Sequence, residues 1–286
     1  MTSDTLKNIF KKSSIGTIIF FVLNAAVIIA LFAGTGPESL LTVLVLYIVS
    51  VFIALSPFGE WLLCLMVGAR KMTRADMKNR MMPLLDEIYR RAKRRTPGLV
   101  DNVDLKVMYT PEPNAYAIGR RTVCVTEGMF GLSDDEIQGI LAHELGHLAC
   151  RHTEIQLLIG GGNFIMTMLI LMIKTISTLI TVFSLYSGYS NRSWVPVIIG
   201  LFLAGIIWLW TRFCLLFLMW SMRENEFVAD AYAVGLGYGY ELARGLDAIG
   251  TSKPQDSFLR ALYSTHPNAH DRIGRLQQLG VPYSRY

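Results

Sequence analysis

The sequence predicts a mainly α-helical membrane protein, with four transmembrane helices and a cytoplasmic α+β domain that contains a small β-sheet. Three observations lead to this prediction. Of the 286 residues, 52% are hydrophobic and only 17% are charged, whereas soluble chains average about 25% charged residues. The apolar residues gather in long uncharged runs, and basic residues flank them. The polar remainder carries short strand-like and helix-like patterns.

Residues 1–67 are predicted to form an N-terminal transmembrane hairpin. The first apolar run, about 15–33, contains no charge and is long enough to cross about 30 Å of hydrocarbon. No small-residue cleavage site follows it, which favours a retained span over a removed signal. A second run, about 40–67, follows a Gly-Thr-Gly-Pro break, and Pro57 and Glu60 mark where it kinks or leaves the membrane.

A second transmembrane hairpin is predicted over residues 155–222, with spans at about 156–180 and 194–222. Lys174 interrupts the first of these spans. It either extends to the far headgroups or lies inside the membrane with a partner. Because two crossings return the chain to the side it left, the polar pieces before and after this hairpin can meet.

The charge distribution predicts the orientation. Between Gly68 and Thr96 there are ten Lys or Arg and three Asp or Glu, so the N-terminus and the polar pieces, residues 68–154 and 223–286, are expected in the cytoplasm. The run RRAKRR is expected to face anionic lipid rather than nucleic acid, so the lipid bilayer is a predicted partner and nucleic acid is not. Four spans and this chain length favour a bacterial cytoplasmic (inner) membrane.

The first polar piece contains three local patterns. DLKVMYT is typical of a short strand, and AYAIGRRTVCVTEG indicates a hairpin that bends near Gly119-Arg120. Ser133 and Glu136 form a capping-box pattern, which predicts a helix through residues 137–152.

That helix carries the sequence HELGH. His143 and His147 are four residues apart, so both imidazoles project from one helix face. This spacing allows both rings to bind one Zn²⁺, and Glu144 beside them could take a proton from a metal-bound water. The alternative is a pair of solvated or core histidines.

A third ligand is expected from RENEFVADAYAVG, which can continue the fourth span as a helix until Gly235. Glu226 would complete a His₂Glu ligand set, and Asp230 would accept the free N–H of a ligand histidine. Glu224 and Cys150 are weaker alternatives as ligands. In STHPNAHDRIGRL, His266 could donate to a developing oxyanion, and Arg272 could pair with Asp230 or clamp substrate.

Two other histidines allow further interpretations. His270, in the same C-terminal segment, is a third candidate for a role at the site or an ordinary surface residue. His152, five residues past His147, does not share the metal face well and is interpreted as an interfacial residue.

The sequence resembles the HtpX-type integral-membrane zinc metallopeptidases, which are related to the CAAX-prenyl endopeptidases. The resemblance covers nearly the whole chain and includes PNAYAIG, VCVTEGMF, HELGH, EFVAD and THPNAHDRI. It implies a gluzincin-like peptidase domain and one Zn²⁺. The residues implied are the ligands His143, His147 and Glu226, the base Glu144, the supporting Asp230, and a cleft lined by the His266–Arg272 segment.

The same resemblance implies that Asn114 and the strand Thr122–Thr126 border the active site. We expect that strand to be a sheet edge, where Val123, Cys124 and Val125 bind extended substrate by β-addition. An ordinary hairpin packed on the zinc helix is the alternative. The hairpin is shorter than in typical members, so the rim of the site is expected to differ.

The expected function is a zinc endopeptidase that cleaves membrane or misfolded proteins on the cytoplasmic side, in protein quality control. The main alternative is a non-catalytic membrane protein in which zinc clasps the 137–152 and 223–234 helices. A transporter or channel would depend only on Lys174 and Arg212. The oligomeric state stays open.

Overall fold

The computed structural model describes residues 36–154, 195–250 and 269–284, together with Leu157 and isolated positions between 15 and 29 and between 172 and 183. Its described part is mainly helical with one small four-stranded sheet. The chain divides into two compact units. The first contains residues 1–15, 55–157 and 221–286, and the second contains residues 16–54 and 158–220.

The sheet of the first unit has the strand order β1-β2-β4-β3. β1 (Arg70–Lys71) pairs antiparallel with β2 (Asp104–Met108), which pairs in parallel with β4 (Thr122–Thr126). β3 (Ala115–Ile118) pairs antiparallel with β4 and forms one edge. The predicted strand and hairpin are both confirmed. At the bend Gly119 has a φ of +61°, a backbone conformation that favours glycine.

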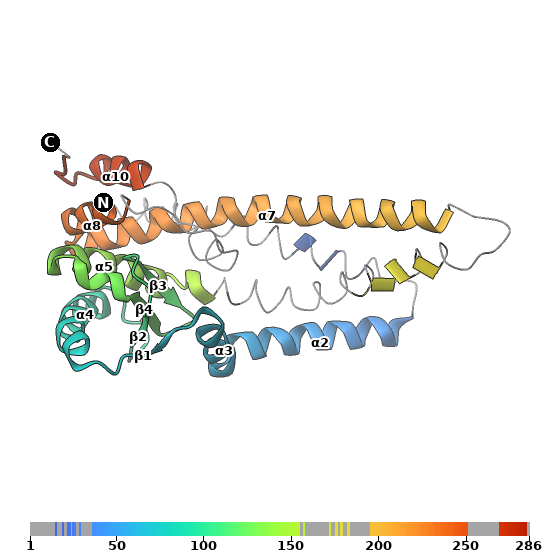
Figure 1. The fold of residues 1–286 in the computed structure, drawn as a ribbon, viewed down its shortest axis with the longest axis horizontal. Coiled ribbons are helices and arrows are strands. Elements are labelled where there is room, and N and C mark those ends of the chain that lie inside the picture. The colour runs from blue at the N-terminus through green and yellow to red at the C-terminus, as the bar shows by residue number, and fades with distance from the viewer. Residues whose placement is uncertain are drawn as a thin grey trace. The chain divides into compact units, whose positions relative to one another are not determined.

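The helix of the HELGH sequence, α5 (Asp134–Ala149), begins with the predicted capping box, in which Ser133 and Glu136 exchange hydrogen bonds. Nearly all of its residues from Ile137 onward are buried, because α5 packs against α4 (Ala75–Arg95), α8 (Gly239–Gly250), β3 and β4 (Figure 1). α5 ends at Ala149, three residues before the predicted end. This central position places the HELGH face inside the main hydrophobic core.

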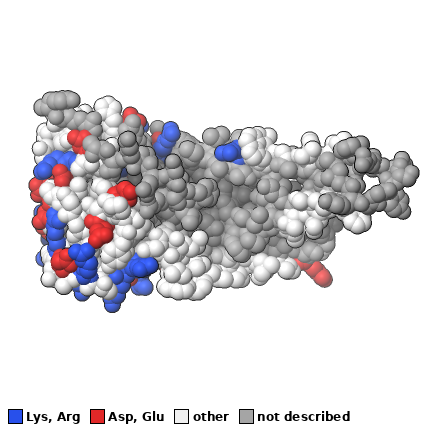
Figure 2. Space-filling view, viewed as in Figure 1, with Lys and Arg blue, Asp and Glu red and all other residues white. Residues whose placement is uncertain are grey.

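Three residues of the basic run at the end of α4 contact other parts of the first unit. The Arg91 guanidinium lies 4.8 Å from the ring centroid of Tyr238, and Arg95 donates to the carbonyl of Gly235 at 2.7 Å. Lys93 donates to Asp101 at 2.9 Å. Arg90, Arg91, Arg94 and Arg95 are exposed, so their contact with anionic lipid stays a prediction. On the face in Figure 2, basic and acidic side chains alternate over the first unit.

α7 (Val195–Leu236) continues without a break into the first unit, which includes its residues from Ser221 onward. The predicted end at Gly235 is wrong. Gly235 lies inside the helix under the Arg95 side chain, and Gly237, with a φ of +90°, is the left-handed residue that follows the helix. α8 follows, and α10 (Ala269–Gln278) packs against α8.

The predicted second span breaks at Ser56. α2 (Pro37–Leu55) ends there, and α3 (Pro57–Val67) begins with Ser56 as its N-cap. α3 groups with the first unit and buries Glu60 and Cys64. The Glu60 carboxylate accepts hydrogen bonds from the Arg120 amide at 3.0 Å and the Thr122 hydroxyl at 2.6 Å, which ties α3 to the β3–β4 bend.

In the second unit, α2 exposes large apolar side chains, among them Leu41, Val45 and Phe52. Within the described ranges no single helix meets the length and hydropathy criteria for a membrane span, and one bent pair, Leu40–Leu55 with Pro57–Val67, meets them together. The expected spans at 15–33 and 156–180, and Lys174, fall largely or wholly outside the described residues.

Candidate metal centre

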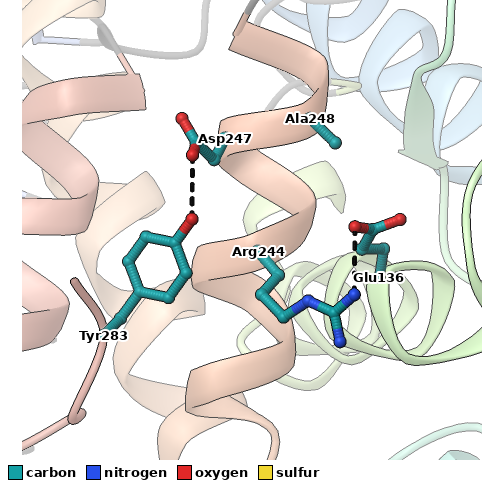
Figure 3. Close-up of a pocket in the computed structure, with 5 residues that line it drawn as sticks. All are labelled: Glu136, Arg244, Asp247, Ala248 and Tyr283. Atoms are coloured by element: carbon teal, nitrogen blue, oxygen red, sulfur yellow. Dashed lines mark hydrogen bonds and ion pairs between the residues drawn. The ribbon is translucent and has the colours of Figure 1, made fainter. Parts of the chain in front are cut away.

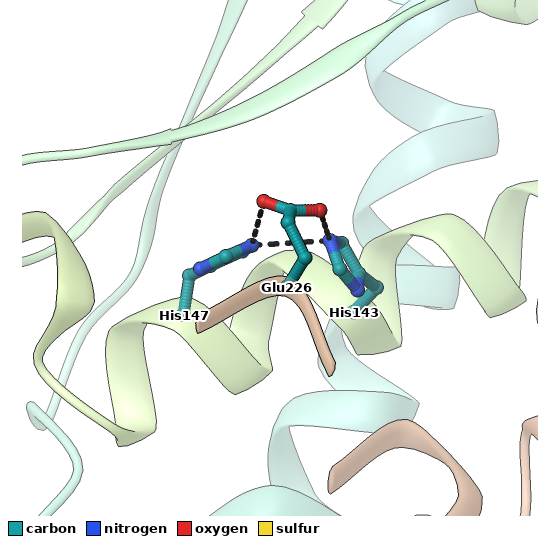
Figure 4. Close-up of side chains that lie close together, drawn as sticks. All are labelled: His143, His147 and Glu226. Carbon is teal, nitrogen blue, oxygen red and sulfur yellow. Dashed lines mark hydrogen bonds and ion pairs between the residues drawn. The ribbon is translucent and has the colours of Figure 1, made fainter. Parts of the chain in front are cut away.

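Two helices of the first unit bring three potential metal ligands together. α5 supplies His143 and His147, and α7 supplies Glu226; all three side chains are buried (Figure 4). The two Nε2 atoms lie 3.1 Å apart. Glu226 Oε2 lies 3.3 Å from His143 Nε2, and Glu226 Oε1 lies 3.2 Å from His147 Nε2.

These separations fit one tetrahedral zinc ion. Ligand atoms about 2.0–2.1 Å from a tetrahedral centre lie about 3.3 Å from one another. The two Nε2 atoms lie 3.1 Å apart, and the Glu226 carboxylate approaches each ring through a different oxygen at 3.2–3.3 Å, which is close to that spacing. The donor set, two imidazole nitrogens and a carboxylate, is one that catalytic zinc sites use. His143, His147 and Glu226 can therefore hold the ion that the sequence predicts.

The buried charge around this group also fits a divalent cation. Glu144, Glu226 and Asp230 are buried carboxylates, and Arg272 is the buried guanidinium among them. With neutral histidines this leaves a formal charge of −2. Buried charge is costly unless it is compensated. A divalent ion would neutralise the surplus.

The pKa values of His143 and Asp230 reflect the same surplus of buried negative charge. Burial and Arg272 lower the pKa of His143, but Asp230 and Glu226 outweigh them and raise it to about 9. Burial alone would raise the pKa of Asp230, yet Arg272 and then His143 hold it below its usual value. Without a metal the carboxylates thus favour a proton on His143, and metal binding would displace that proton.

Asp230 and Arg272 form an ion pair beside His143. Asp230 Oδ1 lies 2.8 Å from His143 Nδ1, so this N–H can donate to the carboxylate while Nε2 faces the ligand group. Arg272 donates through Nε to Asp230 Oδ2 at 2.9 Å and through Nη2 to Oδ1 at 2.5 Å. Its Nη1 lies 3.3 Å from Glu226 Oε2. Of the two sequence alternatives for Arg272, the structure shows the pair with Asp230.

Glu144 lies at the edge of the ligand group without belonging to it. Its Oε1 is 4.0 Å from His143 Nε2. Its Oε2 accepts a hydrogen bond from the backbone amide of Ala117, in β3, at 2.7 Å. This amide therefore points away from β4 and toward the site. The edge strand nearest the HELGH helix is β3.

The expectation that Thr122–Thr126 is an edge strand is wrong. β4 pairs with β2 on one side and with β3 on the other, so neither of its edges is free. Val123, Cys124 and Val125 are 0% exposed and cannot contact an extended substrate. Asn114 precedes β3, and its side chain contacts the Tyr116 hydroxyl and the Ala115 amide.

The remaining candidates from the sequence are not part of the ligand group. Among the described residues, Glu224 and Cys150 do not join the cluster of His143, His147 and Glu226. Burial raises the pKa of Cys150 to about 12, which disfavours the thiolate that zinc would need. His270 is exposed on α10, and His266 lies outside the described residues.

The sequence did not point to a contact between His152 and a metal ligand. Its Nδ1 lies 3.1 Å from Nδ1 of His147, and its side chain is buried. Burial, followed by the neighbouring His147, lowers the pKa of His152 well below its usual value, so the ring is neutral. His152 therefore packs inside the first unit against a ligand histidine. A five-residue spacing offers no helical signal for this contact.

A shallow hollow on the same unit has a different lining. Glu136, Arg244, Asp247, Ala248 and Tyr283 surround it (Figure 3). Arg244 contacts Glu136 at 3.4 Å, and the Tyr283 hydroxyl donates to Asp247 at 2.8 Å. None of these residues belongs to the metal-ligand group.

Comparison with known proteins agrees with the metal-site chemistry. The sequence model of peptidase family M48 matches residues 78–279. The "Protease HtpX homolog" of Tropheryma whipplei (strain Twist) is 28% identical over 249 residues, covering 78% of this chain and 80% of the relative. The "Protease HtpX homolog" of Halobacterium salinarum is 26% identical over 308 residues, covering 92% of this chain and 99% of the relative.

The solved structure of S. mikatae Ste24p has a similar fold. It aligns with a TM-score of 0.50 and 21% sequence identity, over 94% of this chain and 66% of that protein. The family match spans all of α5, α7 and α10, the elements that position the ligands and Arg272. The chain belongs to peptidase family M48, as a zinc metallopeptidase with an HExxH motif at His143–His147 and Glu226 beside it.

Proposed function

We propose that this peptidase is an integral-membrane endopeptidase that uses one Zn²⁺ per chain. It cleaves membrane or misfolded proteins at the cytoplasmic face, as part of protein quality control. The observation that carries the proposal is the group of three ligands with Glu144 beside it. A structural zinc clasp normally has four protein ligands. Three ligands leave a place for water or substrate.

Zinc bound here would polarise the substrate carbonyl and increase the acidity of a bound water. The protein's own residues do the rest. His143, His147 and Glu226 hold the metal, and Asp230 fixes the proton of His143 on Nδ1. Glu144 is the general base, because its carboxylate is next to the ligand group without belonging to it. It accepts a proton during attack on the carbonyl and passes it to the leaving amine.

The hydrogen bond from Ala117 to Glu144 supports a substrate path along β3. This bond holds the Glu144 carboxylate between the ligand group and the edge strand. An extended peptide could pair with the outward-facing main-chain groups of β3. Main-chain pairing does not depend on side-chain identity, so broad sequence tolerance follows. Asn114, at the start of this edge, stays our candidate for a substrate contact.

The C-terminal segment has two proposed roles. His266 donates to the oxyanion that develops on the substrate carbonyl. Arg272 is assigned to supporting the metal ligands through Asp230 and Glu226, instead of to substrate binding. Its guanidinium already contacts Asp230 and Glu226, and it is 3% exposed. A buried and doubly paired guanidinium has little freedom to reach a substrate.

The membrane location is supported by composition and by the exposed apolar side chains of α2. We propose the two transmembrane hairpins at 1–67 and 155–222, with the N-terminus and the active site in the cytoplasm of a bacterial inner membrane. Residues 190 and 252 should then lie on opposite sides. Membrane-impermeant thiol labelling of Ser190→Cys and Ser252→Cys in a cysteine-free background tests this. Labelling of both from the same side would contradict the proposed topology.

The catalytic proposal is tested with Glu144→Gln. Because Glu144 is outside the ligand group, this variant should retain one zinc per chain and lose casein hydrolysis by at least about 100-fold. The partly exposed Glu127→Gln, whose carboxylate pairs with Arg74 rather than with the ligand group, is the matched control and should behave as wild type. Zinc content is measured by elemental analysis of the purified protein. Turnover by Glu144→Gln near the wild-type rate would show that Glu144 is not the base.

A further inference from the structure

His152 and His147 are in direct contact on the side of His147 that faces away from the metal ligands. Their Nδ1 atoms lie 3.1 Å apart. The ring centroids are 5.3 Å apart, and the ring planes meet at 70°. An edge-on arrangement at this nitrogen–nitrogen distance is that of a hydrogen bond. His152 is 1% exposed, so solvent does not compete for it.

An unusual backbone conformation creates this contact. α5 ends at Ala149, and Arg151 has a φ of +58°. Among the described residues Arg151 is the only non-glycine residue with a positive φ. A left-handed conformation is unfavourable for a non-glycine residue. It interrupts the helical path just past α5, and the next residue, His152, lies against His147.

The positions of the protons follow from the ligand geometry. His147 Nε2 faces His143 and Glu226, so this nitrogen must be unprotonated to bind a metal. The proton of the neutral ring is then on Nδ1. In the contact with His152, that N–H is the donor, so Nδ1 of His152 is the acceptor and is unprotonated. The His152 proton is therefore on Nε2, an atom with no hydrogen-bond partner among the residues that the structure describes.

We propose that His152 is a positioning residue for zinc: it accepts the Nδ1–H of His147 and so fixes the ring and tautomer in which His147 binds the metal. This inference rests on the proposed zinc site. It gives the two ligand histidines different supports. His143 donates to a carboxylate, Asp230, whereas His147 donates to a neutral imidazole. A neutral acceptor supports His147 without adding a further buried negative charge.

His152 is not itself a ligand in this arrangement. Its Nδ1 contacts Nδ1 of His147, and the metal would lie beyond Nε2 at the other side of the ring. Simple packing is the competing explanation. Packing requires only a ring-sized side chain at position 152, whereas positioning requires an acceptor atom. The two explanations therefore predict different results for an isosteric ring without an acceptor.

Two variants separate these explanations. His152→Phe keeps a ring but removes the acceptor, and His152→Asn places an amide oxygen near the position of Nδ1. Zinc affinity of the full-length protein in detergent is measured by competition with a chromogenic chelator. His152→Phe should weaken zinc binding about 10–100-fold, and His152→Asn should restore it to within about 3-fold. Thr153→Val, a buried neighbouring change, should leave it unchanged.

A measurement on the wild-type protein does not depend on how the variants fold. In the Co²⁺-substituted protein, proton NMR should show two exchange-protected, metal-shifted imidazole N–H signals, one for His143 and one for His147. Three results would overturn the inference. They are wild-type zinc affinity in His152→Phe, an equal loss of zinc affinity in His152→Phe and His152→Asn, or rapid solvent exchange of the second imidazole N–H signal. If the wild type binds no zinc, or Glu144→Gln keeps turnover, the proposed function fails instead.

Discussion

The buried ion pair between Asp230 and Arg272 provides a quantitative test of the site. Two hydrogen bonds, of 2.9 and 2.5 Å, join the side chains, and both are almost fully buried. Removing one partner of such a pair leaves an uncompensated buried charge and costs about 3–5 kcal/mol. Arg272→Met should lower the free energy of unfolding of the metal-free protein by that amount. Asp230→Asn should lower it by less, because Arg272 keeps its contact with Glu226 at 3.3 Å.

The double variant Asp230→Asn/Arg272→Met should lower the free energy of unfolding by much less than the sum of the two single variants. When both groups are neutral, neither charge is left alone, so the coupling free energy should be about 2 kcal/mol or more. The assay is denaturant unfolding of the metal-free protein in detergent, followed by circular dichroism. The exposed pair of Arg244 and Asp135, 3.2 Å apart, is the control and should couple by less than about 1 kcal/mol. Equal coupling free energies in the two double-mutant cycles would refute the assignment of Asp230 and Arg272 as a strongly coupled buried ion pair.

Three further predictions concern the ligand set, the hairpin and pH. Glu226→Ala should weaken zinc binding at least about 10-fold in a chelator titration, and unchanged affinity would redirect the search for the third ligand. Gly119→Ala should lower the melting temperature, because its φ is +61° and a Cβ would lie 2.5 Å from Glu60 Cδ; Gly98→Ala, in open space, should not. Burial lowers the pKa of His143, but the neighbouring carboxylates outweigh it and raise the pKa to about 9. The proton on His143 should therefore stabilise the metal-free protein fully below pH about 6.5, and this stabilisation should be lost as the pH rises through about 9. Flat stability across this range would contradict the charge assignment.

The parts of the structure that depend on near neighbours in sequence were predictable. The capping box at Ser133, the bend at Gly119 and the four-residue spacing of His143 and His147 each involve contacts within a few residues. Patterns of this range have direct structural consequences. The convergence of Glu226 with the two histidines was also predictable, because a catalytic zinc needs a third protein ligand and RENEFVADAYAVG offers a carboxylate for it, as the family resemblance also implies.

Features that depend on long-range pairing were not predictable. β4 is an inner strand because β2, from earlier in the chain, pairs with it in parallel, and nothing within Thr122–Thr126 shows that. The basic residues at the end of α4 were judged by their charge alone. Their partners, Tyr238 and Gly235, are about 140 residues away in the sequence. His152 depends on the conformation of one residue, Arg151, whose side chain does not favour it.

The central claim is that two imidazoles of α5 and one carboxylate of α7 hold a single zinc ion. Zinc K-edge X-ray absorption of the purified protein, combined with elemental analysis, tests it most directly. We predict one zinc per chain, with nitrogen and oxygen neighbours only, at about 2.0–2.1 Å, and imidazole scattering for two histidines. A sulfur neighbour at about 2.3 Å, or a zinc content unaffected by Glu226→Ala, would contradict it.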